Sequence, residues 1–575
     1  MGSHKTLTLF RGGYLTRVAH RRASWLAVVL LAILLWTVAY PNAAVVISSF
    51  GHGLEYWREF VHSPADREAL WTSLWISVAS VVTATAIGVP LAFLLTRTEF
   101  RGRRLLQAAA TLPAALPPLV GVIAFLFLYG ESGVVTRGVQ ALLGRRDPPW
   151  TLSGGWAIVF VHAYTMYVYV YLFVAAGLER YDTSLDEAAT GLGAGVARRL
   201  WRVTIPLLTP ALAGATLLVF MSSLGSFSAP YIFGGGLRVL ATQIVTSRLN
   251  GATGIASVET TVLAVSAIAA LGLSRWIEGR LRYTGATKGG SRPVRRALGT
   301  PWMRIGAPTL ATIVVATAVL PHAMIVLVSF ARDGAWTTQV LPPAYTFENY
   351  RRLVTEASLW APIRNSVTMA VLSTAAAVMV CAAAAYLLVL RRVPGRRLLA
   401  LLVALPWALP ATAVGIGLAS TFNVNDPMTL RFLLVGTFWI LPLAYFVRGV
   451  PLVSSAVEGS LRQMDPSLED AARGLGAGWW LTCRKVLSPA AGPGLIAGAT
   501  LAAITAVGEF VASVVLYTHA NRPISVEILA QLRDFSFGTA AAYSVVLIGI
   551  VLVITLATRL IAPSYQGQNA AVSNL

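Results

Sequence analysis

Two short polar segments contain the residues whose types and spacing could do chemistry. The first reads Ser184-Leu-Asp-Glu-Ala-Ala-Thr-Gly-Leu-Gly193, and the second reads Ser467-Leu-Glu-Asp-Ala-Ala-Arg-Gly-Leu-Gly476. A proline follows each segment at the same distance, as Pro206 and Pro489, so the two copies keep a constant offset of 283 residues. Two copies in a fixed register are hard to obtain by chance, and they indicate one functional element that is used twice.

Each segment also has the spacing of a capped helix. Ser184 and Glu187 stand three residues apart, as do Ser467 and Asp470. In a capping box the hydroxyl accepts the amide proton three residues on, and the carboxylate reaches back. The alanines that follow give such a helix a small, smooth face, and the closing glycine suits a helix end. The sequence therefore predicts a short helix beginning near Ser184 and another beginning near Ser467.

Glu509 is a carboxylate within a long apolar run, where an ionisable residue is a functional hypothesis by default. At the 283-residue offset its counterpart is Ser226, so Gly508-Glu-Phe510 and Gly225-Ser-Phe227 are one element written twice. A negative charge on one side of a polar path suits a cationic substrate such as ferric ion. The alternatives are a glutamate that reaches water near the outer interface and one that braces a gate. The predicted pathway residues are Glu509, Ser226, Ser222, Ser228 and Ser513.

A stripe of tyrosines has two interpretations. Tyr164, Tyr167 and Tyr171 fall on one helical face, and phenolates can bind ferric ion, but an aromatic packing stripe is the preferred interpretation. His162 stands alone and is interpreted as a core histidine with satisfied hydrogen bonds. Cysteine, histidine and methionine do not cluster, so the sequence predicts no metal passage and leaves a metal site undecided.

These candidates must be positioned by membrane helices, because the composition excludes a soluble protein. Of the 575 residues, 56% are hydrophobic and 12% are charged, whereas soluble proteins carry about 25% charged residues. Many apolar runs reach the roughly 20 residues that span a bilayer core, and a transmembrane barrel would show short alternating segments instead. The net charge of +21 comes from basic residues in short loops. They are typical of cytoplasmic anchors, and no basic face with interleaved aromatics indicates nucleic-acid binding.

Twelve spans are predicted, six in each half of the chain. With the N-terminus inside, 31 of the 45 Lys and Arg residues fall in cytoplasmic segments, which places both termini and both polar segments in the cytoplasm. The predicted spans are 24–50, 70–95, 105–128, 155–177, 207–230, 256–274, 305–330, 364–390, 398–422, 432–452, 490–515 and 538–560.

The repeat extends beyond the polar segments. Gly102-Arg-Arg-Leu-Leu106 recurs as Gly395-Arg-Arg-Leu-Leu399. Because six spans per half is an even number, the two halves have the same orientation and form a parallel repeat. We expect a first half over 1–280, a basic cytoplasmic linker over 281–304 and a second half over 305–575.

Prolines lie within or beside several spans, at Pro113, Pro117, Pro118, Pro406 and Pro410. Each removes a helical hydrogen bond and kinks the helix. The kinks are interpreted either as packing features or as bends that shape a central cavity.

The polar segments carry the pattern E-A-A, three residues, G, nine residues, I-x-L-P. This sequence resembles the permease subunits of ATP-binding-cassette importers, in which that pattern is the signature loop. Its departures from the pattern are Asp470 for glutamate, Val203 and Val486 for isoleucine, and Ile205 and Ser488 for leucine. The serine replaces an apolar anchor, so the second loop fits the family pattern less well.

The resemblance implies an all-α polytopic membrane protein of about twelve helices, with cytoplasmic coupling loops over 180–206 and 463–489. Each loop would dock a helix on an ABC ATPase, present in two copies, and an extracytoplasmic substrate-binding protein would deliver substrate. No G-x-x-x-x-G-K-[ST] loop occurs in the chain, so ATP and Mg would be bound by the partner. The chain itself would be a transport subunit of the bacterial inner membrane rather than an enzyme, and it would have no cofactor of its own. The residues implied in coupling are Glu187, Ala188, Ala189, Gly193, Pro206, Asp470, Ala471, Ala472, Gly476 and Pro489.

The substrate is less well defined. The fused twelve-span form, with Ser228-Ala-Pro-Tyr-Ile-Phe-Gly-Gly235, looks like permeases for ferric iron. Relatives in the same family carry thiamine, phosphonate, putrescine, sulfate or molybdate. Alternatives of other classes are an ion-coupled secondary transporter with parallel repeats and a membrane scaffold or signalling protein, neither of which would need the signature loops.

Overall fold

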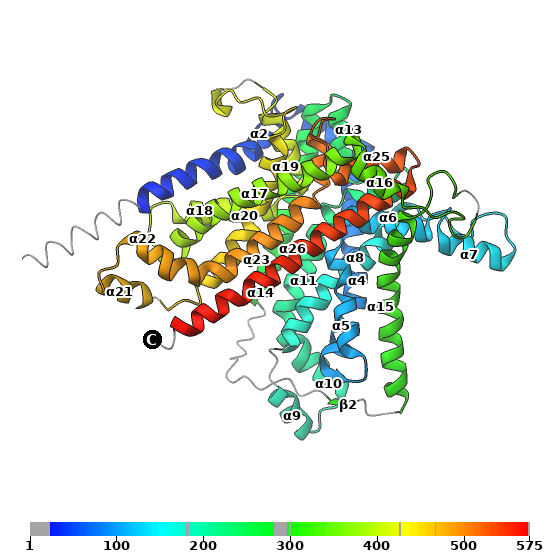
Figure 1. Ribbon diagram of the computed structural model, residues 1–575, viewed down its shortest axis with the longest axis horizontal. Helices are drawn as coiled ribbons and strands as arrows, with labels where there is room; N and C mark the ends of the chain where they lie inside the picture. The colour runs from blue at the N-terminus through cyan, green and yellow to red at the C-terminus, as the bar shows by residue number, and fades with distance from the viewer. Residues whose placement is uncertain are drawn as a thin grey trace, which may run out of the picture. The chain divides into compact units, whose positions relative to one another are not determined.

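The computed structural model describes residues 23–179, 183–280, 296–297, 301–336, 339–424, 427–465 and 467–572. Nearly all regular structure there is helical (Figure 1). Most of the predicted linker, 281–304, lies outside the described residues.

The first half begins with a helix over Ala23–Ser48, whose end is α2 (Tyr40–Ser48). Its further helices are α3 (Glu55–His62), α4 (Pro64–Arg97), α5 (Arg103–Ala110), α6 (Pro118–Tyr129), α7 (Val134–Leu143), α8 (Gly154–Glu179), α9 (Thr183–Gly191), α10 (Val196–Arg199), α11 (Ile205–Leu224), α12 (Ser228–Phe233), α13 (Leu240–Leu249) and α14 (Thr253–Arg280).

The second half repeats this order. Its helices are α15 (Pro301–Ser329), α16 (Glu348–Thr355), α17 (Ala357–Leu390), α18 (Arg396–Ala408), α19 (Ala411–Thr421), α20 (Ile440–Leu461), α21 (Ser467–Gly474), α22 (Trp479–Thr482), α23 (Ser488–Val507), α24 (Val511–Leu516), α25 (Ile524–Arg533) and α26 (Phe537–Val572). The short π and 3-10 turns are η1 (Leu35–Ala39), η2 (Leu112–Ala115), η3 (Leu200–Thr204), η4 (Pro427–Thr429) and η5 (Cys483–Leu487), and the strands β1 (Thr98–Glu99) and β2 (Arg296–Ala297) pair in parallel.

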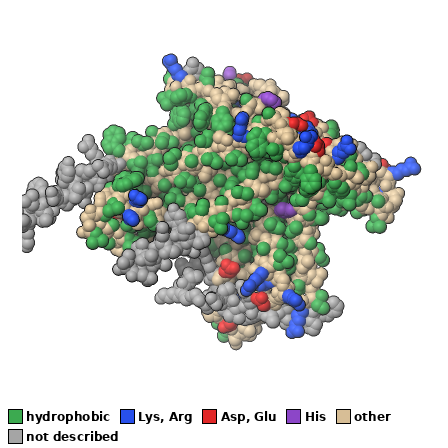
Figure 2. Space-filling view, in the orientation of Figure 1, with side chains coloured by type: hydrophobic (Ala, Val, Ile, Leu, Met, Phe, Trp, Pro, Cys, Tyr) green, Lys and Arg blue, Asp and Glu red, His purple; other side chains and the backbone are tan. Residues whose placement is uncertain are grey.

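The fold class predicted from composition is confirmed. Within the described residues, 11 helices are long and apolar enough to cross a membrane, or 12 if the bent pair α18 and α19 is one span. Large apolar side chains such as Trp71, Val82 and Val371 are more than half exposed on these helices. Figure 2 shows hydrophobic side chains over much of the face in view, with few charged side chains among them. Such a surface is stable against lipid rather than water.

The compact units of the structure combine segments from both ends of the chain. One unit joins residues up to Ile47 with Ala357–Val526 and the chain from Gly549 onward, and the other joins Ser48–Glu356 with Glu527–Ile548. Within the second of these, α15 packs against α5 and α6 although it begins the second half. The halves predicted from the repeat, 1–280 and 305–575, are copies in the sequence rather than compact units in space. Their boundaries remain a prediction.

Three helices form the centre of each unit. In one unit α4 and α8 run side by side, and α11 packs on both (Figure 1). In the other unit the corresponding helices α17, α20 and α23 pack together in the same way. The second, fourth and fifth spans of each half therefore hold the core, so a force on one of them is passed to the other two.

The prolines break helices as predicted. α18 and α19 are bent by 111° at the break before Ala411, and Pro410 is the N-cap residue of α19. In the first half the equivalent helix is interrupted by η2 before α6 begins at Pro118. Because the proline ring cannot continue the backbone hydrogen bonds, the third span of each half is a broken helix.

Serine hydroxyls of the second spans form hydrogen bonds to the starts of α13 and α25, the helices that follow the fifth spans. Ser73 Oγ in α4 accepts a hydrogen bond of 2.8 Å from the backbone N–H of Leu240, the first residue of α13. Ser366 Oγ in α17 accepts an equivalent bond of 2.8 Å from Ile524 N–H at the start of α25. The first N–H groups of a helix have no partner within it, so these serines satisfy a donor and fix the helix start in both units.

Candidate functional site

Both predicted polar helices are present, and α9 and α21 are here called the loop helices. They begin at Thr183 and Ser467, as the capping pattern predicts. The cap of α21 differs from the prediction, because the Ser467 backbone N–H donates to Asp465 Oδ1 at 2.9 Å. Asp470, expected to reach back to this amide, has an 82% exposed side chain that lies 3.9 Å from Arg473. Asp465 lies two residues before Ser467, and an aspartate at that spacing readily accepts a hydrogen bond from the backbone N–H. This bond from Ser467 holds the pKa of Asp465 below its usual value.

The two loop helices end in the same geometry. Gly193 N–H donates to Thr190 O and the next N–H donates to Ala189 O, each at 2.9 Å. The same pair of bonds recurs at Gly476. Gly193 and Gly476 have φ of +77° and +80°, the left-handed conformation that ends a helix without strain only at glycine. The predicted role of both glycines as helix ends is confirmed.

Each loop helix presents an exposed face of small, apolar and acidic residues. Leu192, directly after α9, is 88% exposed and Leu475, its counterpart directly after α21, is 90% exposed. Glu187, Ala188 and Ala471 are exposed as well. Ala189 and Ala472 are half-buried, and Pro206 and Pro489 are half-buried at the start of the fifth spans. We call the exposed residues the docking face of each loop helix, since a large exposed apolar side chain beside a flat alanine surface suits a protein partner.

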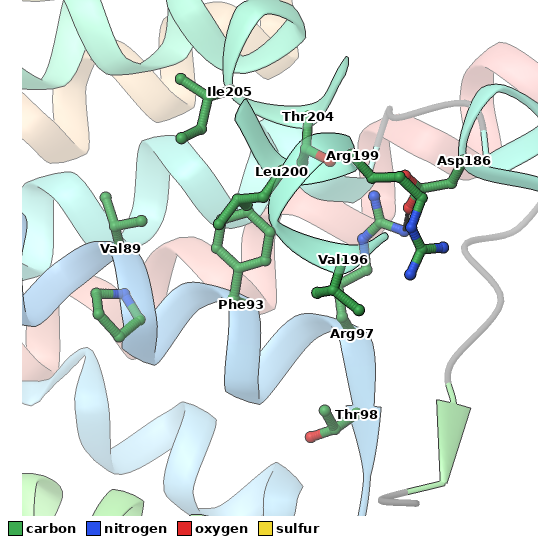
Figure 3. A pocket seen from close by; sticks show the side chains of 11 residues that line it. Val89, Phe93, Arg97, Thr98, Asp186, Val196, Arg199, Leu200, Thr204 and Ile205 are labelled. Atoms are coloured by element: carbon green, nitrogen blue, oxygen red, sulfur yellow. Dashed lines mark ion pairs between the residues drawn. The ribbon is translucent and has the colours of Figure 1, made fainter. Parts of the chain in front are cut away.

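Two acids that the sequence analysis did not select lie on the opposite side of the loop helices. Asp186 Oδ2 lies 3.9 Å from Arg97 Nη1 (Figure 3), and Glu469 forms an ion pair with Arg391. Each arginine stands at the end of the second span of its own unit. The sequence carries no local signal for these pairs, because the partners lie far apart along the chain.

The fifth span of each half is interrupted at the predicted polar element. α11 ends at Leu224 and α12 begins at Ser228, while α23 ends at Val507 and α24 begins at Val511. Ser226 and Glu509 lie in these two breaks, at equivalent positions as the repeat predicts, although the predicted spans 207–230 and 490–515 were continuous there. Ser228 and Ser513 are buried, and Ser222 and Ser226 are half-buried. A break in a span frees backbone groups that must find partners or line a cavity.

Glu509 does not carry an uncompensated charge. It is 6% exposed, its Oε2 lies 2.6 Å from Arg448 Nε, and its Oε1 accepts a bond of 3.1 Å from Ala512 N–H. The expectation of a negative charge on one side of the path is wrong in this respect, because the guanidinium on α20 neutralises the carboxylate. Arg448 was missed since a charge pair between two spans leaves no periodic signal in the sequence.

The counterpart site in the first half is neutral. His162 on α8 is 2% exposed, and its Nε2 lies 2.9 Å from Ser226 Oγ. Its Nδ1 lies 3.0 Å from Ser80 Oγ and 3.1 Å from Ser223 Oγ. The interpretation of His162 as a satisfied core histidine is confirmed. At the 283-residue offset from His162 stands Tyr445, whose hydroxyl lies 2.7 Å from Ser513 Oγ.

The tyrosine stripe is a packing feature, as preferred. Tyr164, Tyr167 and Tyr171 are buried. The Tyr164 hydroxyl donates to Ala318 O at 2.7 Å, and the Tyr167 hydroxyl donates to Ala110 O at 2.9 Å. Across the part of the chain that the structure describes, no group of three or more His, Cys, Asp and Glu side chains could hold a metal ion.

Comparisons with known proteins agree with this architecture. Residues 84–283 and 377–567 each match the family described as "Binding-protein-dependent transport system inner membrane component". The "Probable ABC transporter permease protein y4fN" of Sinorhizobium fredii is 28% identical over 519 residues, which cover 90% of this chain and 91% of that protein. The "Ferric transport system permease protein FbpB" of Actinobacillus pleuropneumoniae is 26% identical over 547 residues, 92% of this chain and 76% of that protein.

A shorter relative matches one half only. The "Molybdenum transport system permease protein ModB" of Mycobacterium tuberculosis is 29% identical over 240 residues, 41% of this chain and 88% of that protein. Two family matches in one polypeptide correspond to the duplicated loop helices and duplicated span breaks. The chain therefore belongs to the binding-protein-dependent transport system inner membrane components, as a multi-pass permease that carries both copies of the membrane domain.

Proposed function

We propose that this chain is the membrane permease of an ATP-driven importer, supplies both membrane halves, and works by alternating access. The observation that carries the proposal is the docking face repeated on α9 and α21, with Leu192 and Leu475 almost fully exposed. One ABC ATPase docks on each loop helix. The ATPase binds ATP and Mg, and the chain itself performs no covalent chemistry.

The docking face supplies two kinds of contact. Ala188 and Ala471 allow a partner backbone to approach closely, while Glu187 and Asp470 offer exposed carboxylates to basic residues. Closure of the ATPase dimer on ATP would draw the loop helices together and open the permease outward, and hydrolysis would return it inward. An extracytoplasmic binding protein delivers the substrate to the outward-facing state.

We infer ferric iron as the substrate. The support is that relatives matched over about nine-tenths of this chain are named as ferric transport permeases, whereas the molybdenum relatives match two-fifths of it. Glu509, the carboxylate predicted for the pathway, is paired with Arg448 and is therefore not offered bare to a cation. Selection of iron therefore falls to the binding protein.

Copurification from native membranes tests the importer. The intact chain should retain an ATPase with a Walker A loop, and Leu192→Asp together with Leu475→Asp should release it, because both substitutions place a charge in an apolar contact. Leu142→Asp is the matched control, since Leu142 is 84% exposed but belongs to α7 and not to a loop helix. Retention of the ATPase by the double variant, or its absence from the intact chain, would contradict the proposal.

An uptake assay tests the substrate. Cells or vesicles that contain the transporter should take up ⁵⁵Fe, and excess molybdate should not inhibit this uptake.

A further inference from the structure

Each loop helix carries two neighbouring acids that face different sides of the helix. Glu187 on α9 and Asp470 on α21 are exposed, and the Asp470 side chain is 82% exposed. The preceding acids, Asp186 and Glu469, have side chains that are 18% and 9% exposed. Neighbouring residues on a helix point about 100° apart, so one acid of each pair is offered to a partner and the other faces its own chain.

The inward acid meets an arginine at the same place in both units. Arg97 is the last residue of α4, and Arg391 directly follows α17, which ends at Leu390. α4 and α17 are the second spans of their halves, and both ends are predicted to be cytoplasmic. The contact between loop helix and second span is therefore built twice from unlike residues, with aspartate in one copy and glutamate in the other.

The contact in α21 is rigid. Arg391 Nη1 donates to Glu469 Oε2 at 3.1 Å and its Nη2 contacts Oε1, which is the bidentate geometry of a strong pair. The other edge of the guanidinium is held as well, because Arg391 Nε donates to the Tyr386 hydroxyl at 2.8 Å. Burial alone would lower the pKa of Arg391, but the hydrogen bonds it donates to Glu469 and the nearby Tyr386 raise that pKa. Arg473 Nη2 lies 2.6 Å from Glu469 Oε1, but it belongs to the same helix.

The contact in α9 is loose by comparison. Arg97 Nη1 lies 3.9 Å from Asp186 Oδ2, which is beyond hydrogen-bond distance, and Arg199 donates to Thr190 Oγ1 of the helix at 2.5 Å. A cavity of about 550 Å³ lies beside this contact, and its apolar wall includes Phe93 and Leu200 (Figure 3). Empty apolar space leaves a helix room to shift without displacing packed side chains.

We propose that Asp186 and Glu469 are positioning residues that join each loop helix to the second span of its half, and that the Glu469–Arg391 contact transmits movement more tightly than the Asp186–Arg97 contact. The inference rests on the proposed function, because it assigns the step between ATPase docking and the membrane helices. Each second span packs against the fourth and fifth spans, which carry His162, Arg448 and the two breaks. A pull on a loop helix thus reaches Ser226 or Glu509 through one packed helix.

The test uses the full transporter in proteoliposomes, with its ATPase and binding protein, and measures substrate taken up per ATP hydrolysed. Glu469→Gln and Arg391→Met should each lower this ratio about tenfold, which corresponds to about 1.4 kcal/mol. The double variant should be no worse than either single variant, since both remove the same contact. Asp186→Asn should lower the ratio about twofold, because its contact is already loose. The ATPase should copurify with every variant.

Two controls separate transmission from simple loss of stability. Arg473→Met removes a bond to the same carboxylate without touching the link to α17, so it should leave the ratio unchanged. Glu469→Asp keeps the charge and should retain most of the ratio. If a single variant fails to insert, the double variant, which buries no unpaired charge, still gives the measurement. An unchanged ratio in the double variant, or an equal loss in Arg473→Met, would overturn the proposal. Loss of ATPase copurification from the intact chain would instead overturn the proposed function.

Discussion

At the scale of single residues, the pair Glu509 and Arg448 shows how a buried charge is tolerated in a span. The Glu509 side chain is 5% exposed and the Arg448 side chain is 26% exposed, with 2.6 Å between Oε2 and Nε. Removing one member of a buried pair leaves the other uncompensated, which costs on the order of 3 kcal/mol. The two members should not be equivalent, because the carboxylate is more deeply buried than the guanidinium.

We therefore expect Arg448→Gln to damage the protein more than Glu509→Gln. The first leaves a carboxylate that is almost fully buried, while the second leaves the more exposed guanidinium. The double variant Arg448→Gln/Glu509→Gln carries no net buried charge and should recover most of the stability. Thermal unfolding in detergent and substrate uptake together measure these effects. Equal losses in the two single variants that add up in the double variant would show that the pair does not act as a unit.

His162 gives a second prediction at this scale. Both ring nitrogens have serine partners at 2.9 to 3.1 Å. Without the imidazole, Ser80 still donates to Ile76 O and Ser223 still donates to Ser80, whereas Ser226 loses its bond to His162. His162→Phe should lower the apparent melting temperature, since each unsatisfied buried polar group costs about 1–3 kcal/mol. His162→Gln keeps polar atoms at that position and should lower it less. A phenylalanine variant as stable as the intact chain would mean that the serines do not need the imidazole.

At the scale of elements, the loop helices end in a conformation that only glycine adopts without strain. Gly193 and Gly476 have open space where a Cβ would stand, so the cost of substitution is in the backbone rather than in a clash. A left-handed conformation costs other residues about 1–2 kcal/mol. Gly193→Val and Gly476→Val should therefore fray or re-aim the loop helices and weaken ATPase copurification, while insertion persists.

Neighbouring glycines provide the control for that prediction. Gly191 and Gly474 lie within the loop helices, also face open space, and do not have positive φ. Gly191→Ala and Gly474→Ala should leave ATPase binding unchanged or strengthen it, because alanine favours a helix by about 1 kcal/mol over glycine. Equal weakening by the alanine and valine variants would point to the docking surface rather than to the helix end.

Much at this scale could be predicted from the sequence, and the exceptions have one physical cause. The loop helices, their closing glycines and the proline breaks all rest on local rules of capping, φ and missing N–H groups. The break in each fifth span was not predicted, because the predicted spans 207–230 and 490–515 run through it. The partners of Glu509, His162 and Glu469 could not be predicted, because each pair joins different helices. The cap from Asp465 was not predicted, because the capping-box spacing selects Asp470, whereas Asp465 precedes the helix.

At the scale of the whole molecule, the repeat places the same three spans at the core of each unit. The charge of the loops sets the orientation predicted for all of them, with the basic loops near Arg397 in the cytoplasm and the segment near Phe347 outside. Phe347 is 75% exposed and Arg397 is also exposed. Either position can therefore carry a reactive cysteine without disturbing the core.

Labelling of intact cells tests this orientation. In a background with Cys381→Ala and Cys483→Ser, Phe347→Cys should react with a membrane-impermeant maleimide and Arg397→Cys should not. Permeabilising the membrane should make Arg397→Cys react. This control would show that the cysteine is accessible and that the intact membrane had kept the reagent from it. A cysteine within 280–300 should behave like Arg397→Cys. The opposite pattern would place both loop helices outside, where no ATPase could reach them. That result would contradict both the predicted orientation and the proposed importer mechanism.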